Sequence, residues 1–274
     1  MRIFIVTLLF FAAFTATAQD STYDKLYREG TEALKIKDYK SAISIFLNTI
    51  SSNPKSPLNE YAYVNLGYAY EQEGNLNEAL QSYSNALEIN PASVNTLTQR
   101  AKILMLMDEI DAALSDYNSI LQIEPKNGSA LFFRAYIYSR DKEYDKAIAD
   151  YHTLLAQEPD NDKARLSLAL LYRKSGHINE CTMLLEQLIE EHPTNAEYYI
   201  VRSNMEREDK RTMLAIMDAE KAIELAPENP EYRVLLAELL IESGNKKEAK
   251  EALNAAIAMG YNEENVMYLY NKCK

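Results

Sequence analysis

The sequence predicts an all-α solenoid built from about seven repeated helical hairpins. The first observation is a proline that recurs every 34 residues, at Pro91, Pro125, Pro159, Pro193 and Pro227. The second is a pair of offsets in this period that hold only small residues. With Glu60 as position 1 of its unit, position 8 holds Gly30, Gly67, Ala101, Ala135, Ala169, Ser203 and Ala237, and position 20 holds Ala42, Ala79, Ala113, Ala147, Cys181, Ala215 and Ala249. Self-similarity at a fixed period is typical of architectures in which each unit packs only on its neighbours.

Residues 61–91 show most clearly why one unit forms a hairpin. A turn signal, Gly74 followed by Asn75, separates two halves of helical periodicity. The spacing of one helix face appears on both sides of that turn, in Tyr63, Leu66 and Tyr70 and again in Ala79, Tyr83 and Ala86. Neither helix could bury its apolar stripe alone. We therefore expect the two to pack together, with Gly67 and Ala79 at their closest approach.

The whole pattern resembles the tetratricopeptide repeat (TPR) family. That family has an aromatic residue or leucine near position 4, glycine or alanine at 8, tyrosine at 11, alanine at 20 and 27, an aromatic residue at 24 and proline at 32. Seven units match it, near 23–56, 60–93, 94–127, 128–161, 162–195, 196–229 and 230–263. The resemblance implies a right-handed superhelix in which the first helices of the hairpins form a concave wall that binds other proteins.

Two departures from the pattern fall late in the chain. Glu206 occupies position 11 of the sixth unit, where an apolar residue is expected, and position 24 loses its aromatic residue in the last three units. We expect looser packing in units six and seven. After the seventh unit a short amphipathic segment, 263–274, carries Val266, Leu269 and Tyr270 on one face. It is predicted to be a helix that caps the end of the core, as repeat proteins require.

Helix starts and turns are also marked. Asn229 before Pro230 indicates a capped helix start with proline at its first position. The spacing of Thr194 and Glu197 indicates a capping box. A three-residue insertion separates units one and two, where Ser56 before Pro57 has the pattern of an N-cap followed by proline at the first helical position. We expect the insertion to lengthen either the next helix or its entry loop.

The N-terminal residues 1–18 do not belong to the repeats. Arg2 precedes an apolar run from Ile3 to Phe14, and the triplet 16–18 (Ala-Thr-Ala) is a small-x-small cleavage signal. This pattern predicts a signal peptide over 1–18, followed by the solenoid over 19–274. An uncleaved anchor is the alternative, but about 20 apolar residues are needed to cross a bilayer. We expect an exported protein, in the periplasm or alternatively secreted, with no membrane span once the signal is removed.

Composition narrows the function further. The net charge is −12, so we expect no binding to nucleic acid. The only histidines are His152, His177 and His192, and no metal-binding, phosphate-binding or catalytic motif occurs. We therefore expect no enzyme, no catalytic residues, no metal and no cofactor. Cys181 and Cys273 are nearly three repeats apart, too far for a disulfide within the chain. Whether Cys273 pairs with another chain stays open.

Candidate binding residues lie at positions 2, 6, 9 and 13 of the first helices, opposite the packed face. In units one to five these positions hold Arg28, Lys35, Lys102, Arg140, Lys163 and Lys174 against one acid, Asp24, whereas units six and seven hold only acids, Glu197, Glu208, Glu231, Glu238 and Glu242. Aromatic and amide side chains alternate with the bases, as in peptide-binding surfaces. The predicted peptide-binding residues are Tyr61, Asn65, Tyr68, Gln99, Lys102, Phe133, Tyr136, Arg140 and Lys174. The alternative is that the rings at positions 6 and 9 only pack on the neighbouring unit.

These observations together favour a non-enzymatic scaffold in the cell envelope. We expect it to bind an extended, acidic segment of a protein partner in the concave groove. The alternative is a structural or assembly subunit of a larger envelope complex that uses its ends or its convex face. The sequence leaves the partner, the process and the oligomeric state open.

Overall fold

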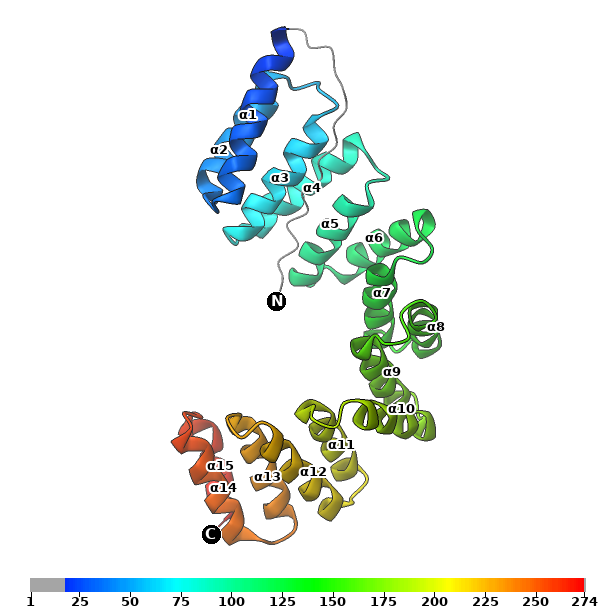
Figure 1. Cartoon of the computed structure of the whole chain (residues 1–274), viewed down its shortest axis with the longest axis vertical. Coiled ribbons are helices and arrows are strands. Elements are labelled where there is room, and N and C mark those ends of the chain that lie inside the picture. The colour runs from blue at the N-terminus through cyan, green and yellow to red at the C-terminus, as the bar shows by residue number, and fades with distance from the viewer. Residues whose placement is uncertain (1–17, 274) are drawn as a thin grey trace. The chain divides into compact units, whose positions relative to one another are not determined.

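The structure is a computed structural model that describes residues 18–273 (Figure 1). All regular elements in these residues are helices and none is a strand, so the predicted all-α class is confirmed. The predicted signal peptide lies almost wholly outside the described residues. The helices are α1 Ala18–Lys35, α2 Tyr39–Ser52, α3 Asn59–Gln72, α4 Leu76–Ile89, α5 Val94–Leu106, α6 Ile110–Ile123, α7 Gly128–Arg140, α8 Tyr144–Leu155, α9 Asp162–Lys174, α10 Ile178–Glu191, α11 Ala196–Glu208, α12 Thr212–Leu225, α13 Pro230–Glu242, α14 Lys246–Ala258, the 3-10 helix η1 Glu263–Val266 and α15 Met267–Lys272.

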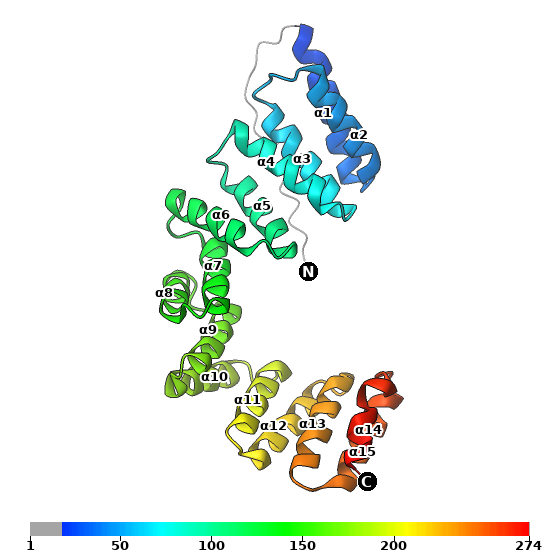
Figure 2. The same ribbon diagram turned by 180° about the vertical axis from the view of Figure 1, so that it is seen from behind.

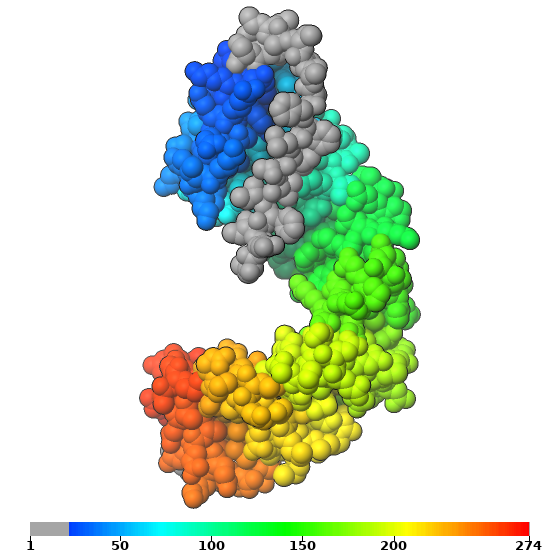
Figure 3. All heavy atoms as spheres, viewed as in Figure 1, coloured from blue at the N-terminus to red at the C-terminus, as the bar shows by residue number. Residues whose placement is uncertain are grey.

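The chain divides into two compact units between Asp141 and Lys142, inside the fourth repeat. The first unit contains α1 to α7 and the second contains α8 to α15. Within each unit, helices that are consecutive in the chain pack on one another, as both ribbon views show (Figures 1 and 2). The space-filling view likewise shows the surface of each unit passing from hairpin to hairpin in chain order (Figure 3). Among the helices of residues 18–273, none combines the length and the hydropathy that a bilayer-spanning segment needs.

The small residues allow the two helices of a hairpin to approach closely. At position 20, Ala42, Ala79 and Ala113 are fully buried, as are Cys181, Ala215 and Ala249 in the second unit. At position 8, a Cβ atom added to Gly67 would lie 2.8 Å from Cε1 of Tyr83, and one added to Gly30 would meet Phe46 at the same distance. Both rings are fully buried. The predicted close approach at Gly67 is therefore confirmed.

The expected looser packing of units six and seven is not observed. Ala219, Leu239 and Leu253 are fully buried in one continuous core cluster. Val266 and Leu269 extend this cluster from η1 and α15, so the predicted capping segment does cover the end of the core. Glu206 does not disturb the packing, because its carboxylate forms an ion pair with Arg211.

Three predicted helix starts have different outcomes. The side chain of Asn229 accepts a hydrogen bond from the backbone N–H of Glu231, with Pro230 at the start of α13, as predicted. The capping box at Thr194 is wrong, because Asn195 caps α11 instead. For the insertion before α3, the helix start at Ser56 is wrong, whereas the alternative, a longer entry loop, is confirmed. The insertion forms a turn in which Ser56 Oγ accepts from the N–H of Leu58 at 3.2 Å, and α3 begins only at Asn59.

The turn inside each hairpin requires a left-handed residue at position 15. Glycine supplies it at Gly74, Gly176 and Gly244, with φ between 79° and 87°. The other four units place Lys37, Asp108, Lys142 and Lys210 there, with φ of 61° or 62°. A side chain in this region costs roughly 1–2 kcal/mol, because its Cβ approaches the following carbonyl oxygen. Local backbone hydrogen bonds close the turn in units with a side chain at this position, as from the N–H of Asp38 to the carbonyl of Ala33 at 2.9 Å and from that of Glu109 to Leu104 at 2.8 Å.

Changing Lys210 to glycine is expected to raise the free energy of unfolding by about 1 kcal/mol, because it removes this strain. Gly176→Ala should lower it by a similar amount, since it introduces the same strain. Urea unfolding followed by circular dichroism measures both. Lys250→Gly, inside α14, is the matched control and should be destabilising by about 1 kcal/mol. A loss of stability in the Lys210 variant would contradict the strained turn.

Candidate functional site

The predicted binding residues lie on one face of each first helix. Residues 61, 65 and 68 fall on α3, residues 99 and 102 on α5, and residues 133, 136 and 140 on α7. Spacings of three, four and seven residues bring side chains to the same side of a helix. These helices all belong to the first unit. Lys174 ends α9 of the second unit and is exposed there.

Three tyrosines make up the exposed aromatic part of this face. Tyr61, Tyr68 and Tyr136 are 48%, 41% and 51% exposed. The ring of Tyr68 meets that of Tyr39 edge to face, with centroids 6.3 Å apart. This contact orients Tyr68 while leaving much of the ring open to solvent. We call the residues Tyr61, Tyr68, Lys102 and Tyr136 the tyrosine face.

Two other predicted residues hold neighbouring hairpins together. Phe133 stacks on the fully buried ring of Tyr117, with centroids 5.6 Å apart and ring planes 12° from parallel. Asn65 Nδ2 donates a hydrogen bond of 3.0 Å to the hydroxyl oxygen of Tyr27 on α1. For Phe133 and Asn65 the geometry favours the packing interpretation. Gln99 is half-buried on α5.

The cationic character of the first unit is weaker than the sequence suggested. Arg140 Nη1 lies 2.7 Å from Asp108 Oδ1 in the turn after α5, and the guanidinium holds the pKa of that carboxyl below its usual value. Lys35 pairs with Glu32 at 2.9 Å. Lys102 is half-buried on α5, and residues 18–273 supply it with no carboxylate partner. Lys102 is therefore the cation on the tyrosine face that stays available to a ligand.

Several of the acids at the predicted positions of units six and seven are paired with arginines from another position. Arg207, at position 12 of the sixth unit, contacts the carboxylates of Glu238 and Glu242, both at 2.8 Å. Arg173 pairs in the same way with Glu208 and Asp209. Position 12 was left out of the predicted face, although each arginine is followed 35 residues later by a glutamate. These pairs cross-link successive first helices of the second unit, and Arg173 lowers the pKa of Asp209.

An open cleft of about 480 Å³ lies beside these ion pairs. Asn204, Arg207, Glu208 and Glu242 line it. Its charged groups are bonded to one another or to Arg173. The cleft is therefore a gap between paired side chains, and no group converges on it from a buried position.

Sequence reasoning also missed a buried ion pair inside the hairpins. Arg100 on α5 donates to both carboxylate oxygens of Asp116 on α6, at 2.9 and 2.7 Å. Arg202 and Asp218 repeat the arrangement in the second unit, at 2.8 and 2.7 Å. Asp116 and Asp218 are 3% and 7% exposed. An arginine followed 16 residues later by an aspartate is the signal that could have revealed these pairs.

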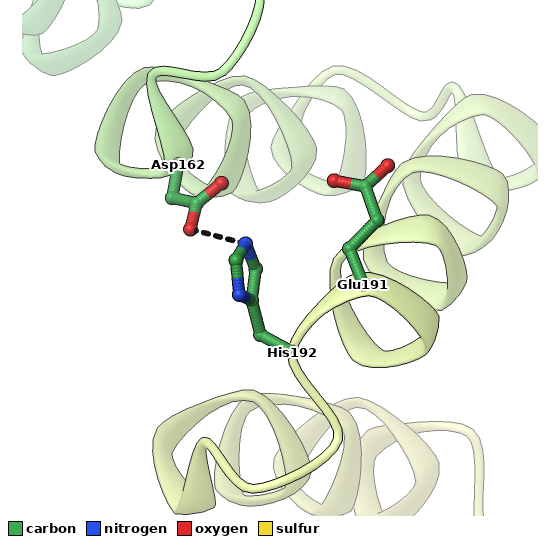
Figure 4. Close-up of side chains that lie close together, drawn as sticks. All are labelled: Asp162, Glu191 and His192. Carbon is green, nitrogen blue, oxygen red and sulfur yellow. Dashed lines mark ion pairs between the residues drawn. The ribbon is translucent and has the colours of Figure 1, made fainter.

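One mixed cluster has the composition of a metal site. The ligand atoms of Asp162, Glu191 and His192 lie within 4.8 Å of one another (Figure 4). His192 Nε2 is 2.9 Å from Asp162 Oδ2, which also accepts from the Tyr198 hydroxyl at 3.2 Å. Both carboxylate oxygens of Glu191 accept from the guanidinium of the buried Arg165.

The positive charge that this cluster needs is supplied by arginine. Arg165 holds the pKa of Glu191 below its usual value, and it also lies 3.4 Å from Asp162. A divalent cation would have to displace a bidentate guanidinium, which is among the stronger partners of a carboxylate. The cluster is best described as a network that ties the start of α9 to the end of α10 and to α11.

An exposed apolar residue beside Lys102 was not among the predicted binding residues. Leu106 is 68% exposed and lies one helical turn after Lys102 on α5. Leu106 occupies position 13 of its unit. At this position the predicted binding face included charged residues only. Leu106 adds apolar surface next to the available cation of the tyrosine face.

Comparison with known proteins gives a consistent result. One model of the tetratricopeptide repeat matches residues 139–205 and 207–273, and a second matches residues 60–93. No curated protein sequence matches the chain. Many solved structures are similar to it.

Among these structures is a tetratricopeptide repeat protein from Parabacteroides merdae. It is 27% identical, covers 92% of this chain and 99% of its own, and has a TM-score of 0.75. The C-terminal part of a TPR repeat-containing protein from Cytophaga hutchinsonii is 18% identical over 90% of this chain and 99% of its own, with a TM-score of 0.68. YrrB, described as a TPR protein with an unusual peptide-binding site, is 16% identical over 66% of this chain and 92% of its own, with a TM-score of 0.54.

Proposed function

Since the chain belongs to the tetratricopeptide repeat family, we propose that it is a non-enzymatic scaffold whose tyrosine face binds an extended segment of a partner protein. The observation that carries this proposal is the half-exposure of three tyrosine rings on the first helices of one compact unit. Tyrosine offers a large and rigid apolar surface with a polar tip, and it is enriched where proteins bind one another. The unusual peptide-binding site described for YrrB supports the same use of the fold.

An acidic segment fits this face best. Lys102 lies among the tyrosines without a carboxylate partner in residues 18–273. Exposed Arg28 adds positive charge on α1. A segment that brings a carboxylate to Lys102 gains an ion pair, whereas a basic segment is repelled.

The proposed location is the cell envelope, and the N-terminal pattern of residues 1–18 supports it. An exported scaffold would meet its partner in the periplasm. The members of the tyrosine face offer rings, hydroxyl groups and one ammonium group, which suit the binding of a protein segment. The scaffold proposal therefore assigns them binding alone.

The test is a triple variant, Tyr68→Ala with Lys102→Glu and Tyr136→Ala. The variant protein should fail to capture the partner from an extract of the native envelope, while its circular dichroism stays that of a helical protein. It removes two exposed rings and reverses the charge between them. Capture by the wild-type protein should weaken as salt is added, since an exposed ion pair is screened.

The matched control shortens two exposed apolar side chains to alanine and reverses one lysine on second helices. Leu47→Ala, Lys40→Glu and Ile123→Ala alter side chains of α2 and α6, where Leu47 and Ile123 are 44% and 45% exposed. This control should capture the partner as well as the wild type does. Undiminished capture by the tyrosine-face variant would show that the partner binds elsewhere.

A further inference from the structure

The tyrosine face contains a row with a fixed step. Tyr68, Lys102 and Tyr136 are each separated by 34 residues, so they occupy the same position on α3, α5 and α7. All three helices lie in the first compact unit. Because each hairpin stacks on the next in chain order, equivalent positions on successive first helices lie in line across the face. The row therefore alternates ring, cation, ring.

Side-chain hydrogen bonds join two of the three pairs of successive first helices in this unit. Asn65 on α3 is bonded to Tyr27 on α1, and Arg140 on α7 is bonded to Asp108 just after α5. Packed helices have axes about 8–10 Å apart. A segment in the polyproline II conformation has three residues per turn and advances about 3.1 Å per residue, so side chains three residues apart point to the same side and lie about 9 Å apart, close to one step between helices.

Each residue of the row determines which kind of side chain of the bound segment it attracts. The rings of Tyr68 and Tyr136 are half-exposed. Each offers an apolar surface to an apolar side chain of a bound segment. Lys102 lacks a carboxylate partner within residues 18–273 and attracts an acid. Exposed Leu106, one turn further along α5, gives the methylene groups of that acid an apolar surface.

We propose that the Tyr68–Lys102–Tyr136 row selects an extended segment, in the polyproline II conformation, in which an apolar residue, an acidic residue and a second apolar residue follow one another at intervals of three. This proposal rests on the proposed function, because it concerns the same face. It adds a register. Recognition depends on the spacing of the acid relative to the two apolar side chains, and overall negative charge alone is not sufficient.

The charge around the row supports one acid at its centre. Arg140 is occupied by Asp108, and Lys35 by Glu32. The positive charge that remains on the row is that of Lys102. An acid moved by two residues would point away from the row, so it would lose the ion pair with the ammonium group while the segment keeps the same net charge.

The experiment compares two capped nine-residue peptides by fluorescence anisotropy with the full chain. The first has leucine at its second and eighth residues and glutamate at its fifth, with serine elsewhere. The second has the same composition, with the glutamate moved to the third residue. We expect the first to bind about tenfold more tightly, which corresponds to one well-placed interaction.

A charge exchange provides the second readout. In the Lys102→Glu protein, a peptide with lysine at its fifth residue should bind about tenfold more tightly than the glutamate peptide, reversing the wild-type order. Lys40→Glu on α2 makes the same change in net charge and should leave the wild-type order intact.

The outcomes separate this inference from the proposed function. Equal binding of the two glutamate peptides overturns the register but leaves the scaffold standing. Reversal by Lys40→Glu as well as by Lys102→Glu overturns it too, because net charge would then explain the preference. Failure of both peptides to bind, while the tyrosine-face variant loses its native partner, overturns the spacing alone. Failure of the peptides together with undiminished partner capture by that variant overturns both proposals.

Discussion

Replacing Gly67 with alanine is expected to lower the free energy of unfolding by about 2 kcal/mol. Alanine is normally the better helix former, by roughly 1 kcal/mol. Here its Cβ would lie 2.8 Å from Cε1 and 2.9 Å from Cδ1 of Tyr83. The ring cannot move away freely, because it is fully buried and its hydroxyl donates to Glu71 at 3.1 Å. The clash should therefore exceed the gain in propensity.

A double variant tests this explanation for Gly67. The fifth repeat naturally combines Ala169 with Leu185 at the two corresponding positions, and both are buried. Adding Tyr83→Leu to Gly67→Ala should recover part of the lost stability, and the coupling between the two changes should be favourable. The measurement is urea unfolding of the wild type, both single variants and the double variant. Strict additivity would show that the ring is not the obstacle.

The second large effect is expected at the buried ion pair of the third repeat. Asp116→Ala should lower the free energy of unfolding by about 3 kcal/mol, because Arg100 would keep its charge in a largely buried site without a partner. The side chain of Arg100 is 26% exposed, so the loss should fall at the low end of the range for buried pairs. Ser84, which accepts from Arg100 at 3.3 Å, cannot replace a carboxylate.

Two comparisons make this result specific. Asp108→Ala breaks an ion pair of similar length that is exposed to solvent, and it should have a much smaller effect. Replacing both members, with Arg100→Met and Asp116→Leu, should recover most of the stability, since apolar residues of similar volume can replace a buried pair. Thermal and urea unfolding would measure these differences. Equal losses for the two aspartates would contradict the role assigned to burial.

Some features of the site could be predicted and others could not. The half-exposure of Tyr61, Tyr68 and Tyr136 is what their offset in the repeat suggests, and their binding role stays a prediction. Phe133 has the same helical face as Tyr136, but its ring reaches Tyr117 on the preceding helix. The difference depends on the direction in which a neighbouring hairpin approaches, and a single helical period does not contain that information.

The sequence by itself determined the hairpins, the small residues between their helices and the chain order in which they stack. These features are local or strictly periodic, so the 34-residue repeat states them directly. Only the tertiary structure decided which charges remain available to a ligand. Arg140 is paired with Asp108, Arg207 with Glu238 and Glu242, and Lys102 with no carboxylate of the described residues. The physical reason is that a long charged side chain pairs across the gap between two helices, and the width and angle of that gap are set by packing.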